Sequence, residues 1–150
     1  MKKFQFSLDS VLSYKEQVLE SLQGEHAAIL ARVHAQEQVL ESVWQQYRDC
    51  DDEYRQRKAE GITILDATFY QDGLRVLEWH IQQETDKLEE LKKREEAKRQ
   101  EVVNAKIDTS SIEKLKEKKL EMYNKEVAKS EEVLIDEFVS SARARAGIGA

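Results

Sequence analysis

Few residues in this sequence have the type and spacing that catalysis or metal binding requires. The three histidines are His26, His34 and His80, and none has companion ligands at the spacing of a zinc site. His26 falls on an apolar stripe described below, where a packed histidine is the simpler interpretation, and His34 is expected to face solvent. We therefore predict no metal ion bound through these imidazoles.

Paired carboxylates could share a proton in acid–base catalysis, and they occur at Glu89-Glu90, Glu95-Glu96 and Glu131-Glu132. Such chemistry needs a cavity that desolvates one carboxyl group, which a pair of helices does not offer. The chain also lacks a glycine-rich phosphate loop and a Gly-x-Ser-x-Gly motif. Cys50 is the only cysteine, which excludes an intramolecular disulfide and fits a reducing compartment. We predict neither catalysis nor a cofactor.

The composition indicates long helices. Charged residues make up 36% of the 150 residues, proline is absent and there are five glycines. Basic and acidic residues alternate even in the lysine-rich run Lys114–Lys119, so we interpret this run as a solvated helix face and predict no nucleic-acid binding. The sequence shows neither a signal-peptide pattern nor an apolar stretch of membrane-spanning length, so we predict a cytoplasmic protein.

Apolar residues recur at alternating spacings of three and four along the first part of the chain, as in a coiled coil. This first stripe contains Leu8, Leu12, Lys15, Leu19, Leu22, His26, Ile29, Val33, Gln36, Leu40, Val43, Tyr47, Cys50 and Tyr54. Ser7 is a candidate N-cap, and Gly61 stands where a left-handed residue would end the helix. The stripe therefore predicts a first helix over about residues 8–60.

A second stripe follows a capping pattern that begins at Thr63 and includes Asp66. It contains Tyr70, Leu74, Leu77, Ile81, Glu84, Leu88, Leu91, Glu95, Lys98, Val102, Ala105, Thr109, Ile112 and Lys116. A tight turn at 61–63 forces the second helix back along the first. When the chain is folded about residue 62, every position of one stripe meets a position of the other. This register places His26 opposite Lys98, Ile29 opposite Glu95 and Lys15 opposite Thr109.

We predict an all-α fold: one domain, 1–150, that forms a long two-helix antiparallel coiled-coil hairpin. The second helix covers about residues 64–145, and residues 117–140 overhang the end of the first. A break near 108–111 is the alternative to one continuous second helix. Apolar residues of the overhang have no predicted partner within the chain, so they are candidate binding residues: Leu120, Tyr123, Val127, Leu134 and Phe138.

Several segments, in order along nearly the whole chain, resemble the FliJ family of flagellar export proteins. The start, Phe4-Gln5-Phe6-Ser7-Leu8 through Val11-Leu12, resembles the family's Phe-x-Phe-x-Leu opening. The tip has Gly61-Ile62 followed by Tyr70-Gln71, Leu77-Glu78 and Ile81. Lys114–Lys119 and Asp136-Glu137-Phe138 are similar to the family's basic stretch and Asp-Glu motif.

The resemblance implies a non-enzymatic stalk of the flagellar type III export ATPase, at the cytoplasmic face of the membrane. Family members insert into the ring of the ATPase (FliI) and contact the cytoplasmic domain of the export gate (FlhA), and some bind export chaperones. The gate-docking patch carries over to Tyr70, Gln71, Leu77 and His80. The family often has an aromatic residue where this chain has Gly73. The overhang is expected to bind the ring, with the protein a monomer or a weak homodimer.

Two alternatives stay open at this point. One is the equivalent stalk protein of a virulence-type secretion system, against which the Phe-x-Phe start and the Gly-Ile tip argue. The other is a prefoldin-like or self-associating coiled-coil chaperone, which would form a stable homodimer burying residues 117–140.

Overall fold

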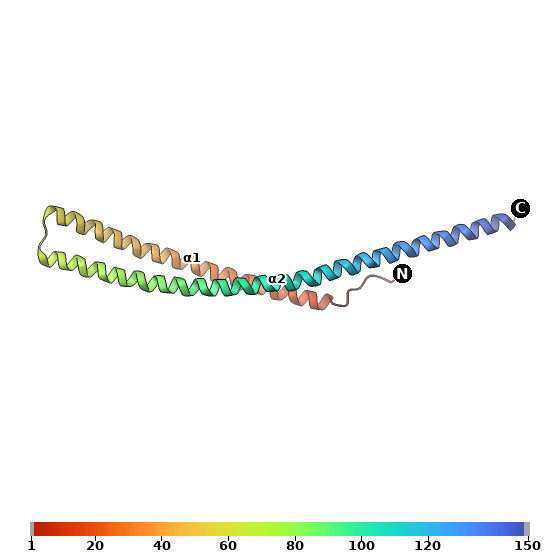
Figure 1. Ribbon diagram of the computed structural model, residues 1–150, viewed down its shortest axis with the longest axis horizontal. Helices are drawn as coiled ribbons and strands as arrows, with labels where there is room; N and C mark the ends of the chain where they lie inside the picture. The colour runs from red at the N-terminus through yellow and green to blue at the C-terminus, as the bar shows by residue number, and fades with distance from the viewer. Residues whose placement is uncertain (1, 149–150) are drawn as a thin grey trace. The chain divides into compact units, whose positions relative to one another are not determined.

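The computed structural model describes residues 2–148 of the chain, which form two α-helices. Helix α1 covers Asp9–Glu60 and helix α2 covers Ile64–Ile148, and no β-strand occurs among the described residues. The two helices run in opposite directions from the turn that joins them (Figure 1). The predicted all-α antiparallel hairpin is therefore confirmed.

Contacts along the hairpin divide it into two parts, each of which contains a segment of both helices. The tip part is Glu20–Asn104, and the terminal part joins Met1–Leu19 to Ala105–Ala150. The two parts are described separately below.

Local signals account for the start and end of each helix. The first intrahelical bond of α1 runs from the Leu12 N–H to the Leu8 carbonyl (2.8 Å), one residue beyond the predicted cap at Ser7. Gly61 ends α1 with a φ of 101°, the left-handed conformation that its position predicted. Thr63 caps α2, because its Oγ1 accepts the Asp66 N–H (3.2 Å).

The seam between the two helices contains the residues that the two stripes predicted. Every position of both stripes is buried or half-buried. In the tip part, the Tyr54 and Tyr70 rings stack with centroids 5.4 Å apart, as the fold about residue 62 requires. Burial of this apolar stripe, rather than helix propensity, is what stabilises such a hairpin.

Polar layers interrupt the seam of the tip part, and their side chains contact neighbours of the residues that the register places opposite them. His26 does not pair with Lys98; its Nε2 lies 2.8 Å from Glu95 Oε1. Lys98 instead donates to Glu25, also at 2.8 Å. These side chains are long enough to reach residues about one turn from the position directly opposite, so their rotamers decide which neighbour they contact.

In the terminal part, α2 is continuous through residues 108–111, so the alternative with a break is wrong. Thr109 is only 3% exposed, and its hydroxyl donates to the Ala105 carbonyl (2.8 Å) one turn earlier in the helix. Ser111 donates in the same way to the Ile107 carbonyl (2.9 Å). These hydroxyls bond within the helix and do not cap a new one, so the chain stays helical.

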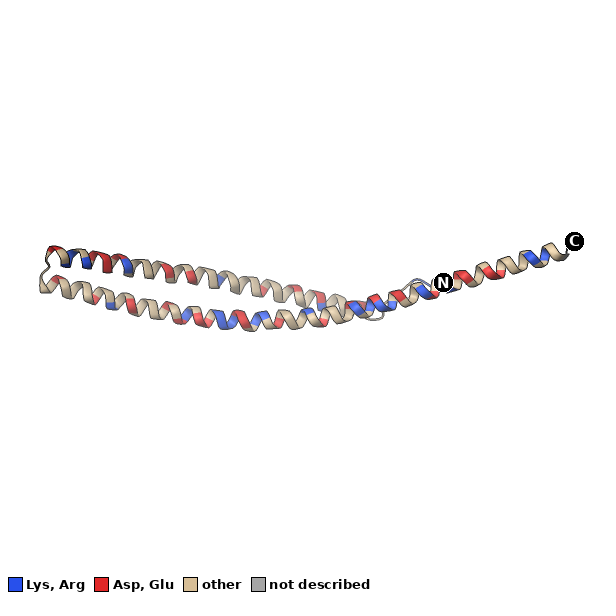
Figure 2. Ribbon diagram, turned by 45° about the horizontal axis from the view of Figure 1, so that its top comes forward, with Lys and Arg blue, Asp and Glu red and all other residues tan. Residues whose placement is uncertain are grey.

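Charged residues of both signs alternate along the outer surfaces of α1 and α2 (Figure 2). They form exposed pairs within one helix, such as Glu121–Lys125 (3.2 Å) and Glu90–Arg94 (3.7 Å). Each such pair contributes only tenths of a kcal/mol, about 0.3–0.5. They keep the surface hydrated without fixing the fold.

Candidate protein-binding surfaces

Of the residues that suggested chemistry, those on the seam are used in packing and the others are exposed. His26 and Glu95 pair within the seam, each with less than a fifth of its side chain exposed. Cys50 is half-buried in the seam, and burial raises the pKa of its thiol, which disfavours the reactive thiolate. No group of three potential metal ligands lies together anywhere in the described chain.

Tyr70, the first residue of the predicted gate patch, belongs to the core. It is 8% exposed, and its hydroxyl donates to Glu53 Oε1 (2.9 Å), which raises the pKa of the phenol. Gln71 is exposed, and its amide donates to the Tyr54 hydroxyl (3.2 Å). Tyr70 therefore fixes the two arms against each other and is not available to a partner.

The other two residues of that patch, Leu77 and His80, differ in their exposure to solvent. Leu77 is half-buried in the seam, whereas His80 is exposed and contacts the Trp79 indole edge-to-face, with ring centroids 5.2 Å apart. Position 73 faces α1: a side chain on Gly73 would begin 3.9 Å from Cys50 Sγ. The structure thus brings Gln71 and His80, but not Tyr70 and Leu77, to the surface.

A second apolar stripe runs along the outer face of α2 just after the turn. We call it the outer tip stripe, and it consists of Leu65 (81% exposed), Phe69 (75%), Val76 (56%) and Trp79 (59%). The spacing of three and four that defines the seam also connects these residues, with Asp72 completing the series. Phe69 and Trp79 can be recognised in the sequence as aromatic residues near the tip and so as candidate binding residues, but their grouping with Leu65 and Val76 on one exposed face was not predicted.

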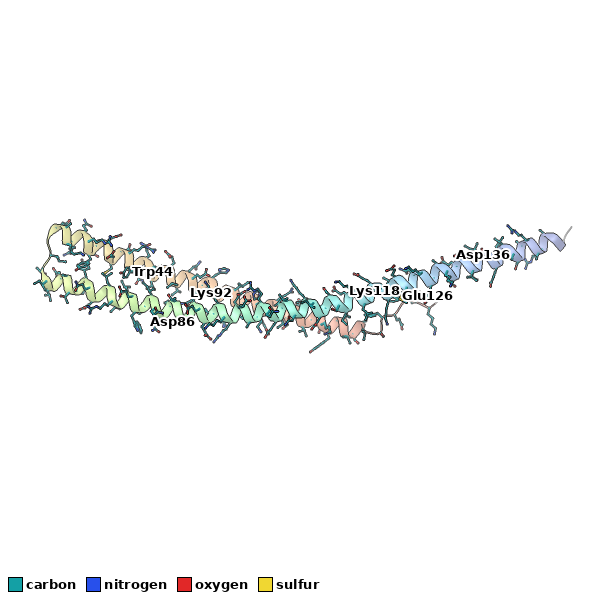
Figure 3. All side chains as sticks on the ribbon, in the orientation of Figure 1. Trp44, Asp86, Lys92, Lys118, Glu126 and Asp136 are labelled. Atoms are coloured by element: carbon teal, nitrogen blue, oxygen red, sulfur yellow. The ribbon has the colours of Figure 1, made fainter. Side chains whose placement is uncertain are left out.

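The tip part also has an exposed aromatic residue on α1. Trp44 is 40% exposed and packs edge-to-face on Tyr47, with ring centroids 5.8 Å apart (labelled in Figure 3). The Tyr47 hydroxyl donates to Glu78 across the seam (3.4 Å). Trp44 is thus held on a fixed support at the surface, as binding residues in protein interfaces often are.

In the terminal part, the start of the overhang has a partner within the chain, which corrects the prediction. Residues 2–8, which we call the N-terminal strap, reach Tyr123: the Phe4 and Tyr123 rings lie 5.6 Å apart. The Tyr123 hydroxyl donates to the Lys2 carbonyl, and Phe6 of the strap is 5% exposed. Lys116 is tied to Asp9 nearby (2.8 Å).

The bare part of the overhang begins later than expected. Leu120 is 40% exposed and Val127 is half-buried, but all of residues 128–147 are exposed. Within this segment Leu134 and Phe138 are 62% and 75% exposed. Side chains project from all sides of the helix around Asp136 (Figure 3). We call residues 128–147 the bare end of α2.

The fold and its surfaces define a class of protein: a two-helix coiled-coil hairpin with apolar residues exposed near the turn and at the bare end of α2. No helix of the described chain is long and apolar enough to cross a membrane.

A family model described as "Flagellar FliJ protein" matches residues 4–147. The chain therefore belongs to the FliJ family, a non-catalytic component of the flagellar export apparatus, as its motifs indicated. Neither the curated proteins nor the solved structures gave a significant match.

Proposed function

We propose that this chain is a non-enzymatic stalk of the flagellar export ATPase, in the cytoplasm at the base of the flagellum. In this role the bare end of α2 binds the ATPase ring (FliI) and the tip contacts the export gate (FlhA). The observation that carries the proposal is an exposed apolar surface in each of the two parts of a hairpin that belongs to the FliJ family.

The bare end of α2 supports ring binding because of its amount of uncovered apolar surface. Val133, Leu134, Ile135 and Phe138 are each about half exposed or more. Exposed apolar side chains in such density mark interaction sites. The strap adds Phe4 and covers Tyr123, so Leu134 and Phe138 carry the ring contact in this proposal, and Leu120, Tyr123 and Val127 contribute mainly to its support.

The outer tip stripe supports docking to the gate. The accessible members of the family patch, Gln71 and His80, are joined on the same helix by Phe69, Val76 and Trp79. Aromatic residues at this density are typical of binding hot spots. Tyr70 and Leu77 then act indirectly, because they hold α2 against α1 beneath this face.

The experiment is a pull-down with purified ATPase and purified gate domain, using the full chain and two surface variants. We expect Leu134→Ser/Phe138→Ser to lose ATPase binding and keep gate binding. Phe69→Ser/Val76→Ser should do the reverse. Asp136→Ser/Ser140→Ala is the matched control on the opposite side of the bare end, and it should bind both partners.

A truncation after Ala128 provides an independent test, since it retains the Phe4–Tyr123 contact. The truncated chain should remain helical by circular dichroism and lose the ATPase. Unchanged ATPase binding by both the truncation and the double variant would overturn the ring contact proposed for this segment.

The two alternative functions predict different results in these assays. A virulence-type stalk would bind the ATPase of its own secretion system and not the flagellar one. A self-associating chaperone would form a tight dimer through residues 117–140 and bind neither purified partner. Binding of export chaperones by this member is a further proposal that the same pull-down can test with purified chaperones.

A further inference from the structure

The bare end of α2 is a helix without tertiary support. Within the described chain, no hydrogen bond or ion pair joins a side chain of residues 128–147 to the rest of the protein. A helix of about 20 residues is only marginally stable in water without a packing partner. Packing against a second helix would therefore bury its apolar residues and stabilise this segment.

Five positions of this segment form a symmetric pattern on one helix face. They are Glu131, Leu134, Phe138, Ala142 and Arg145, separated by three, four, four and three residues. Four of these residues, Leu134, Phe138, Ala142 and Arg145, line one shallow depression together with Glu137 and Ser141. The spacing is the same in both directions from Phe138, whereas the residues differ: Glu131 and Arg145 carry opposite charges at the two ends, and the large Leu134 corresponds to the small Ala142.

That symmetry is what an antiparallel pair of identical helices requires. With two copies crossing at Phe138, Glu131 of each copy meets Arg145 of the other, and Leu134 meets the small Ala142. A parallel pair would instead place Glu131 against Glu131 and Arg145 against Arg145, which is repulsive. Acidic bands precede basic bands toward the C-terminus of α2 (Figure 2), which is the order of Glu131 and Arg145.

We propose that the bare end of α2 binds a second copy of this chain as an antiparallel helix pair centred on Phe138. The contact is isologous, because the same face is used on both copies. It is also short, so the dimer is weak, with a dissociation constant on the order of tens of micromolar. This inference does not rest on the proposed function, since it concerns the isolated protein.

The proposal is tested by sedimentation equilibrium of the full chain and four charge-reversal variants. Arg145→Glu and Glu131→Arg each convert two attractive contacts per dimer into repulsive ones and should weaken the dimer about ten-fold. The double variant Glu131→Arg/Arg145→Glu should restore it. Arg143→Glu is the matched control: it has the same charge change near the same helix end, but it lies off the shared face.

Mixing separates this proposal from other modes of association. Equimolar Glu131→Arg and Arg145→Glu chains should form a heterodimer tighter than either homodimer. In a Cys50→Ser background, Leu134→Cys mixed with Ala142→Cys should give a heterodimeric disulfide much faster than either chain alone.

Four results would overturn the proposal. These are a monomer at concentrations up to the order of 1 mM, a dimer insensitive to Arg145→Glu, a dimer equally sensitive to Arg143→Glu, or a disulfide that forms as readily between identical Leu134→Cys chains. The substitutions at residues 131–145 lie outside the seam and remove no buried residue of the hairpin. Cys50→Ser changes a half-buried seam residue, but it is common to every chain of the disulfide comparison. Circular dichroism should confirm that each one stays helical.

Discussion

Gly61 and Gly24 show how one residue type can have opposite effects at two positions. Gly61 has a φ of 101°, which an L side chain adopts only with strain, whereas Gly24 lies inside α1. We expect Gly61→Ala to lower the free energy of unfolding by about 1 kcal/mol. Gly24→Ala meets no atom within 4 Å and should raise that free energy by about 0.5–1 kcal/mol. Urea unfolding measures both, and effects of the same sign would contradict the assignment of the turn.

The Glu84 carboxylate makes part of the stability depend on pH. The Gln36 amide donates to Glu84, and this hydrogen bond, followed by that from Lys87, lowers the pKa of Glu84 from 4.5. A folded-state pKa below the unfolded value means that the contribution is present above about pH 4.5. It is lost as the pH falls through the folded-state pKa.

Gln36→Met tests this contribution, because it removes the donor and keeps the length of the side chain. We expect the pKa of Glu84, followed by carbon NMR of its carboxyl group, to rise toward the ordinary value. Gln38→Met, at an exposed position of the same helix, is the control and should leave the titration of Glu84 unchanged. A wild-type pKa at or above the ordinary value would contradict the hydrogen bond.

Some contacts of single residues could not be predicted from the sequence. Periodicity placed His26 on the seam, but it could not show that the imidazole reaches Glu95 and not Lys98, because rotamers decide between neighbours one turn apart. The contact of Phe4 with Tyr123 was missed for another reason. The strap is not helical, so no period connects its residues to those of α2.

Among the elements, α2 combines a supported segment and an unsupported one in a single helix. Its residues up to Lys116 carry the seam, whereas residues 128–147 are all exposed. Amide hydrogens in a helix without tertiary contacts exchange through local opening that costs little free energy. We therefore expect hydrogen exchange at 128–147 to be fast in dilute protein, and exchange around the buried Ile81 and Leu88 to be slow.

The concentration dependence of this exchange adds a second comparison. If the bare end of α2 pairs with another copy, its protection should increase as the protein is concentrated, while that of the seam should stay constant. Slow exchange at 128–147 in the dilute monomer would mean that this segment has an intramolecular partner, contrary to the exposure of its side chains.

Elements were easier to predict than binding sites. The apolar spacing and the Gly61 and Thr63 signals located both helices, because burial and chain reversal depend on residue type. The match of the two stripes about residue 62 predicted the covered face of α2, and the stack of Tyr70 on Tyr54 confirms it. That Phe69 and Trp79 share one exposed apolar face with Leu65 and Val76 was not predicted, because this face has no partner stripe in the chain.

For the molecule as a whole, the decisive property is one register shared by both parts of the hairpin. In the tip part the register is marked by the Tyr54–Tyr70 stack, and in the terminal part by Thr109, whose hydroxyl lies 3.4 Å from the Lys15 carbonyl. Both contacts agree with a fold about residue 62. A shift of one heptad would still pair stripe positions with stripe positions, but it would break the Tyr54–Tyr70 stack and the Thr109 contact with the Lys15 carbonyl, so these contacts favour a single register.

Engineered cysteine pairs in a Cys50→Ser background test this register in each part. Leu12→Cys/Ile112→Cys probes the terminal part and Val33→Cys/Leu91→Cys the tip part; the buried Leu12 and Val33 mark the seam on α1. Both pairs should form an intramolecular disulfide under mild oxidation, seen as faster migration of the monomer on a non-reducing gel.

Val33→Cys/Lys98→Cys is the control, because it is displaced by one heptad, about 10 Å along the helix. It should remain reduced, since a disulfide needs Cα atoms within about 7 Å. Equal oxidation of the displaced pair would mean that the arms slide, and a hairpin with sliding arms could not hold the outer tip stripe and the bare end of α2 as two defined surfaces.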